Sequence, residues 1–292
     1  MAPRGPSAAV RRRRRRLRTG VLLTALVAVV VGGTAVAVHH LDDSEVLVRE
    51  RCSATVGADT FELTPTQAGN AALIAGVAVR RGLPARAASI AIATAIQESR
   101  LENIGYGDDA GPDSRGLFQQ RPSQGWGTEE QIMMPLYATG AFYDALVQVP
   151  GYETLPITQA AQTVQRSAFP DAYADHEPEG RAFASALTGN SPAALDCTLR
   201  GPTGTGDALA LSAAAEEVFG PLGGVVDGNR LTLELTGATG WAAAQWAVAN
   251  ASTHSITSVE HAGLRWVRSD GGWTSATSAP GTLVITVAGV TP

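Results

Sequence analysis

Two neighbouring stretches decide the fold: ARAASIAIATAIQESR at residues 85–100 and SRGLFQQRPSQGWGT at residues 114–128. Pro84 begins the first stretch, whose apolar residues leave little polar surface before Gln97 and Glu98. A helix that is apolar on nearly every side is typical of a protein interior. The sequence therefore predicts a buried central helix with a carboxyl group close to its C-terminal end.

Glu98 is the candidate catalytic residue of this helix. Apolar surroundings disfavour the ionised form of a carboxyl group, so the pKa of Glu98 is expected to rise. A carboxylic acid that keeps its proton near neutral pH can protonate a leaving-group oxygen. The alternative is a helix-terminal glutamate that faces solvent, and the segment that follows the helix favours the catalytic interpretation.

Three strings in order carry a family resemblance: IQESRLENIGYGDD at 96–109, GLFQQRPSQGWGT at 116–128 and AAQTVQRSAFPDAY at 160–173. Glu-Ser at a helix end, followed after an irregular stretch by Ser-x-Gly-Leu-Phe-Gln, resembles the goose-type lysozyme and lytic transglycosylase superfamily. The strings are most similar to a lysozyme-like module of actinobacterial wall-associated and phage proteins. The resemblance covers about residues 60–197.

The resemblance implies roles for particular residues. Glu98 matches the acid/base of the family and Ser99 follows it, while four loop residues match the lining of the saccharide groove: Gly116, Leu117, Phe118 and Gln119. A glycine lets the backbone approach a sugar, and a glutamine amide both donates to and accepts from acetamido and hydroxyl groups. Tyr106 and Trp126 are candidate stacking surfaces, with core packing as the alternative for both.

The implied reaction is cleavage of the bond between N-acetylmuramic acid and N-acetylglucosamine in peptidoglycan. A transglycosylase would close a 1,6-anhydro ring, whereas a hydrolase often uses a second carboxylate, for which Asp108, Asp109 and Asp113 are candidates. Many transglycosylases carry Ala-Tyr-Asn-Ala-Gly in a late helix, where this chain has Val164 and Gln165. Gln165 and Tyr173 are candidate replacements in substrate binding. This departure keeps a second hypothesis open, a catalytically inactive lysozyme-fold module that binds peptidoglycan or a cell-wall partner.

The N-terminal region predicts a membrane anchor. Residues 1–20 hold eight arginines (Arg4, Arg11 to Arg16 and Arg18), and residues 21–38 carry no charge. Eighteen apolar residues in a helix approach the thickness of a bilayer core, and the preceding arginines place the N-terminus in the cytoplasm. We therefore expect a single-pass cell-membrane protein with extracytoplasmic domains. The alternative is secretion after cleavage of a signal peptide near residues 35–37.

Charge and cysteine content limit which classes of ligand this chain can bind and indicate one disulfide. After residue 20, the other 14 of the 22 arginines accompany all 27 acidic residues, which argues against nucleic-acid binding. The two cysteines, Cys52 and Cys197, predict one disulfide in an exported protein. Cysteines and histidines lack the spacing of metal ligands, so neither a metal nor a cofactor is expected.

The remaining chain divides into predicted regions. A stalk spans residues 39–58, a mainly α lysozyme-like domain 59–200, a Gly-rich linker 201–207 and a small α+β domain 208–292. The small domain has no catalytic motif, and a protein partner for it is an open alternative. Its four tryptophans favour core packing over sugar stacking: Trp241, Trp246, Trp266 and Trp273.

Overall fold

The helical region is built around α3, the central helix that the sequence predicts. The computed structural model describes residues 48–109, 111–167 and 171–289. The helices of this region are α2 (Pro65–Arg80), α3 (Ala85–Ser99), the short α4 (Glu129–Ile132), α5 (Pro135–Leu146), α6 (Ile157–Gln165) and α7 (Glu177–Leu187). Two 3-10 turns, η2 (Pro122–Gln124) and η3 (Ala172–His176), complete it.

Local sequence signals set the ends of these helices. Thr64 caps α2 with its side chain, and Gln67 returns a bond to the Thr64 N–H, which makes a capping box. Pro84 is the N-cap residue of α3, and its extended backbone (φ −65°, ψ 154°) marks where the helix begins. Eleven of the 15 residues of α3 are buried, and α3 packs against α2, α5, α6 and α7. The predicted central helix is therefore confirmed.

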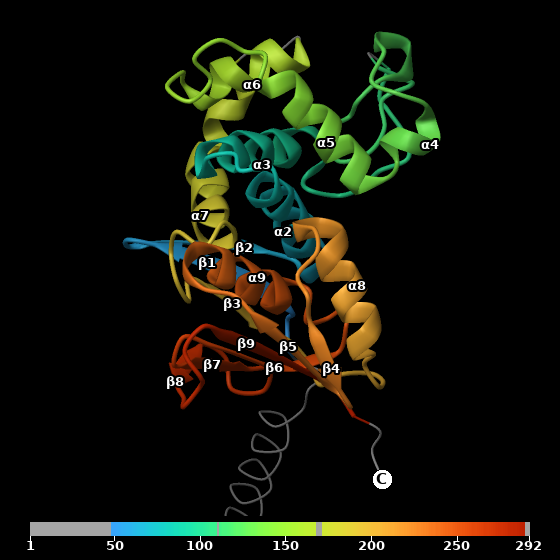
Figure 1. Ribbon diagram of the computed structural model, residues 1–292. Coiled ribbons are helices and arrows are strands. Elements are labelled where there is room, and N and C mark those ends of the chain that lie inside the picture. Colours follow the sequence, from blue (N-terminus) through green and yellow to red (C-terminus); the bar gives the residue numbers. More distant parts are fainter. Residues whose placement is uncertain (1–47, 110, 168–170, 290–292) are drawn as a thin grey trace, which may run out of the picture. The chain divides into compact units, whose positions relative to one another are not determined.

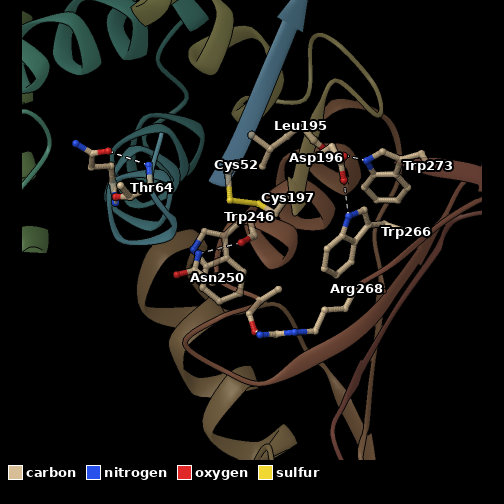
Figure 2. Close-up of a disulfide and its surroundings, with 12 residues drawn as sticks. Cys52, Thr64, Leu195, Asp196, Cys197, Trp246, Asn250, Trp266, Arg268 and Trp273 are labelled. Carbon is tan, nitrogen blue, oxygen red and sulfur yellow. Dashed lines mark hydrogen bonds between the residues drawn. A yellow bond between two sulfur atoms is a disulfide. The ribbon is translucent and has the colours of Figure 1, made fainter. Parts of the chain in front are cut away.

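A three-stranded antiparallel sheet joins the two ends of this region. Its order is β2 (Asp59–Leu63), β1 (Arg51–Val56) and β3 (Leu195–Thr198). Cys52 lies opposite Cys197 in the β1–β3 register, and the two form a disulfide. The predicted disulfide is confirmed, and Figure 2 shows it bridging the neighbouring strands. Strand β1 falls in the range that the sequence assigned to a stalk.

The C-terminal region is a six-stranded antiparallel sheet with two helices. The strand order is β4 (Val225–Asp227), β5 (Arg230–Glu234), β9 (Thr282–Val287), β6 (Ile256–His261), β7 (Leu264–Val267) and β8 (Trp273–Ser275). Helices α8 (Ala208–Phe219) and α9 (Gly237–Ala249) accompany it. Figure 1 shows α9 between this sheet and the helices of the first region. Ten of the 13 residues of α9 are buried because it packs on β6 and β9 as well as on α2, α7 and β3.

Polar contacts reinforce this packing. The Trp266 indole donates to Asp196 at 2.8 Å, and the Trp273 indole donates to the Leu195 carbonyl at 2.8 Å, both on β3 (Figure 2). The four tryptophans of the C-terminal region are buried or partly buried, as core packing requires. Residues from Arg49 onward consequently form one compact unit, although residues 201–207 between the two regions have no regular structure.

The predicted fold class is wrong in one respect. The described residues are 42% helix and 18% strand and contain two antiparallel sheets, so the chain is not mainly α. Strands β1, β2 and β3 are short, and the β1–β3 pairing joins residues more than 140 positions apart. Such pairing leaves little trace in a local pattern, since the contribution of a strand depends on its neighbours.

The expected single-pass arrangement also needs correction. Of the helices within residues 48–289 that the structure describes, none has the length and apolar character to cross a membrane, which conflicts with the expected localisation. The predicted basic segment at 1–20 and the predicted span at 21–38 lie outside the described residues.

Candidate active site

Glu98 lies in the last turn of α3, where the helix ends against three other segments. The next residue but one, Arg100, adopts a left-handed conformation (φ 54°) and ends the helix. The Glu98 side chain is partly buried, and its Oε1 accepts a hydrogen bond of 2.6 Å from the Tyr173 hydroxyl. Tyr173 belongs to η3 and is itself fully buried. Packing of η3 on α3 therefore brings together two residues that the sequence singled out separately.

The surroundings of Glu98 favour its protonated form. Burial raises the pKa of Glu98 above its ordinary value of 4.5, while hydrogen bonds from the Tyr173 and Gln165 side chains oppose the rise. The negative charge of Asp108 adds to the rise in the pKa. Burial also raises the pKa of Tyr173, and the neighbouring charge of Glu98 adds to that effect. Tyr173 is thus a hydrogen-bond donor to a carboxyl group whose pKa is raised by burial.

The Gly116–Gln119 loop is fastened to this site through its backbone carbonyl groups. The Ser99 hydroxyl donates to the Leu117 carbonyl at 2.7 Å, and the Gln165 amide donates to the Phe118 carbonyl at 2.8 Å. The Leu117 and Phe118 side chains are fully buried, and the Phe118 ring stacks on Phe142 with centroids 4.6 Å apart. These two side chains anchor the loop in the core, so the loop presents its backbone to the site.

The other two loop residues hold an unusual backbone. Gly116 has φ +75°, and a Cβ placed there would lie 2.7 Å from the Ile132 carbonyl oxygen, so the position requires glycine. Gln119 also has a positive φ, 47°, and its amide donates to the Gly116 carbonyl at 3.2 Å. The Gln119 amide thus serves the loop itself in this structure.

The two candidate stacking residues differ in position. Trp126 is partly buried against the core and lines a hollow of about 600 Å³. Tyr106 is 70% exposed, and no ring contact or hydrogen bond within the described residues joins it to the other predicted site residues. Trp126 is therefore the better placed of the two.

The hollow beside Trp126 combines an aromatic ring with polar groups. Its lining residues come from the segment around η2, the end of α5 and the end of α6: Gln124, Trp126, Ala145, Gln148, Val149, Pro150, Thr163, Val164, Gln165 and Arg166. Gln165 connects it to Glu98. A second hollow of about 400 Å³ lies at the C-terminal end of α3, on the Gln97 side. Neither hollow includes Glu98 in its lining.

The three candidates for a second carboxylate have different surroundings in the structure. Asp113 accepts from the Arg121 guanidinium at 2.8 Å and from the Ser123 N–H at 3.0 Å, and these hydrogen bonds hold its pKa well below the ordinary value. Asp108 acts electrostatically on Glu98. Asp109 is exposed beside it. Of the three candidates, Asp108 is thus the one whose charge affects the pKa of Glu98.

Several hollow-lining residues were missed by the sequence reasoning. Thr163 and Arg166 flank Gln165 at the end of α6, and Gln124 and Gln148 face them from other segments. The closeness of Thr163 and Arg166 to a candidate residue in the same helix was a usable signal. Gln148 gave none, because its place beside Trp126 depends on how α5 packs.

Neither the scan against protein-family models nor the search of curated proteins found a match to this chain.

Proposed function

We propose that this chain is a lysozyme-like glycosidase that cleaves peptidoglycan glycan strands, a muramidase or lytic transglycosylase with Glu98 as the general acid. The observation that carries the proposal is the Glu98 carboxyl, partly buried and hydrogen bonded by Tyr173, beside a loop fastened by Ser99 and Gln165. An acid with a raised pKa can protonate the glycosidic oxygen at near-neutral pH.

The hollow beside Trp126 supports a glycan substrate. Aromatic faces and amide groups together suit sugars, since a sugar presents both C–H faces and hydroxyl or acetamido groups. Trp126, Gln124, Gln148 and Gln165 supply those groups. Many transglycosylases have a tyrosine in the late helix that this chain lacks. Tyr173 can fill that role here, because its hydroxyl contacts the Glu98 carboxyl directly.

Two routes follow protonation of the leaving group. In ring closure, the Glu98 carboxylate accepts the proton of the muramic acid C6 hydroxyl as its oxygen attacks C1. In hydrolysis, water attacks C1 and gives its proton to a carboxylate, either that of Glu98 or that of Asp108, whose charge acts on Glu98. Both routes place the same first step on Glu98.

Mass analysis of products released from purified peptidoglycan by the full-length chain tests this proposal. We expect soluble muropeptides from the wild type, and a rate at least about 100-fold lower from Glu98→Gln because general acid catalysis contributes about 10²–10⁴-fold. Glu153→Gln, at an exposed position outside both hollows, is the matched control and should retain activity. An anhydro end in the products identifies ring closure. Product release no greater than in buffer from both wild type and Glu98→Gln would rule out cleavage.

A second candidate function is glycan binding without cleavage. The absence of Glu98 from the lining of either hollow favours it. Sedimentation with insoluble peptidoglycan separates the candidates. A pure binder would sediment equally well as wild type and Glu98→Gln, would be lost from the pellet on Trp126→Ala, and would release no muropeptides.

A further inference from the structure

The second hollow is lined by two side chains of opposite charge that have no partner among the residues that the structure describes. It has a volume of about 400 Å³, within the range of about 300–1,000 Å³ common for small-molecule sites. Its lining residues come from β2, α2, α3, η3 and α7: Glu62, Leu63, Gln67, Ile96, Gln97, Arg100, His176 and Glu179. Five segments thus converge on one small space.

Most polar groups of this hollow are already engaged. Glu62 is paired with Arg51 at 2.9 Å. Gln67 completes the cap of α2 with its amide oxygen and donates to the Arg100 carbonyl at 2.8 Å. His176 and Gln97 share a hydrogen bond of 3.0 Å between Nε2 and Oε1. These contacts fix the walls of the hollow.

Arg100 and Glu179 differ from these residues. Among residues 48–109, 111–167 and 171–289, neither the Arg100 guanidinium nor the Glu179 carboxylate forms a hydrogen bond or ion pair, with each other or with another side chain. Glu179 is partly buried, and burial raises its pKa, so a cation beside it would stabilise its charge. A guanidinium binds a carboxylate through two parallel hydrogen bonds.

We propose that this hollow binds the zwitterionic end of an amino acid, with Arg100 holding the α-carboxylate and Glu179 holding the α-ammonium group. A ligand that carries both charges offers a partner to each of these two lining side chains. A ligand with one charge would leave the other side chain unpaired. The proposal does not depend on the chemistry at Glu98, because the hollow lies on the Gln97 side of α3.

Three probes of similar chain length test this site by saturation-transfer NMR with the full-length chain. Meso-2,6-diaminopimelate carries zwitterionic ends, pimelate carries only the carboxylates, and cadaverine carries only the ammonium groups. We expect saturable binding of diaminopimelate and binding at least about tenfold weaker for the other two probes. Absence of diaminopimelate binding, or equal binding of either single-charge probe, would overturn the proposal.

Substitutions of the two charged lining residues test whether diaminopimelate binds in this hollow. Arg100→Gln and Glu179→Gln should each raise the dissociation constant for diaminopimelate at least about tenfold. The matched controls Arg230→Gln and Glu153→Gln change exposed residues outside the hollow and should leave it unchanged. Glu98→Gln should also leave it unchanged, so failure of this site and failure of glycan cleavage are distinguishable. Unaltered affinity in both hollow variants would contradict the assignment.

Discussion

The Tyr173 hydroxyl lies 2.6 Å from Glu98 Oε1, a contact between residues 75 positions apart. The donor is fully buried and the acceptor is partly buried, so water competes little for this bond. The bond lowers the pKa of Glu98 against the stronger effect of burial. Tyr173 therefore tunes the proposed acid as well as orienting it.

Removal of this hydroxyl should shift the pH dependence of cleavage. Without the donor in Tyr173→Phe, the pKa of Glu98 rises further, so the protonated form persists and the alkaline fall in rate moves to higher pH. Loss of a hydrogen bond to a charged group should also lower stability by about 1.5–3 kcal/mol. Rates of muropeptide release across pH, with urea unfolding, provide both measurements.

A matched control for Tyr173→Phe is Tyr143→Phe. The Tyr143 hydroxyl is also fully buried and donates to the Ile74 carbonyl at 3.0 Å, in another part of the helical region. Its loss should reduce stability without moving the pH profile. An identical profile in Tyr173→Phe and wild type would show that the hydroxyl does not act on the acid.

Glu98 should lower the free energy of unfolding at neutral pH. Its folded pKa is raised above 4.5, so the folded protein holds the proton more tightly than the unfolded chain does. Its favourable contribution is present at low pH and is lost as pH rises from the unfolded pKa through the folded pKa. Glu98→Gln keeps an amide oxygen that can accept from Tyr173 and has no charge to bury.

We therefore expect Glu98→Gln to be more stable than wild type at pH 7 and to match it at pH 4. Urea unfolding of the full-length chain at the two pH values measures the difference. Glu153→Gln, at an exposed position, should show no such pH-dependent gain. A Glu98→Gln protein less stable than wild type at pH 7 would contradict the assigned burial effect.

The Gly116 position should tolerate no side chain. Alanine there combines a left-handed backbone with a contact of 2.7 Å to the Ile132 carbonyl oxygen, and we expect a loss of about 2–4 kcal/mol with a fall in cleavage. Gly125 has a similar φ of +83° but no atom within 4 Å of an added Cβ, so Gly125→Ala should lose about 1 kcal/mol. Urea unfolding compares the two, and equal losses would show that the contact with Ile132 relaxes freely.

Gln245 should be the most sensitive polar residue between the helical and C-terminal regions. It is fully buried in α9, where its oxygen accepts the N–H groups of Ala194 and Leu195 and its amide donates to the carbonyls of Ala186 and Ser191. Gln245→Leu leaves the Ala194 and Leu195 N–H groups and the Ser191 carbonyl unpaired, at about 1–3 kcal/mol for each group that finds no water, whereas the Ala186 carbonyl keeps the Gly189 N–H. We expect a loss of at least about 3 kcal/mol in urea unfolding.

The control for this change is Gln159→Leu, on the exposed side of α6. It makes the same substitution without burying an unpaired backbone group, so stability should change by no more than about 0.5 kcal/mol. Similar effects of the two substitutions would mean that the bonds of Gln245 do not hold the two regions together.

The sequence alone determined the helices that depend on local signals. Pro84 before an apolar run predicted where α3 begins, because a helix start and helical periodicity act within one or two turns. The sequence also predicted the Cys52–Cys197 disulfide, since two cysteines allow one pairing. It named Glu98 and Tyr173, although as separate candidates.

Only the tertiary structure decided what these residues contact. The β1–β3 pairing, the burial of Leu117 and Phe118 and the Tyr173–Glu98 bond all join segments far apart in the chain. Their energies depend on packing partners that no local pattern contains. The hollow that holds Arg100 and Glu179 has the same origin, because it exists only where five segments meet. The sequence alone predicted a carboxyl group near a helix end, at Glu98, and packing decides the neighbours of that group and the direction in which its pKa moves.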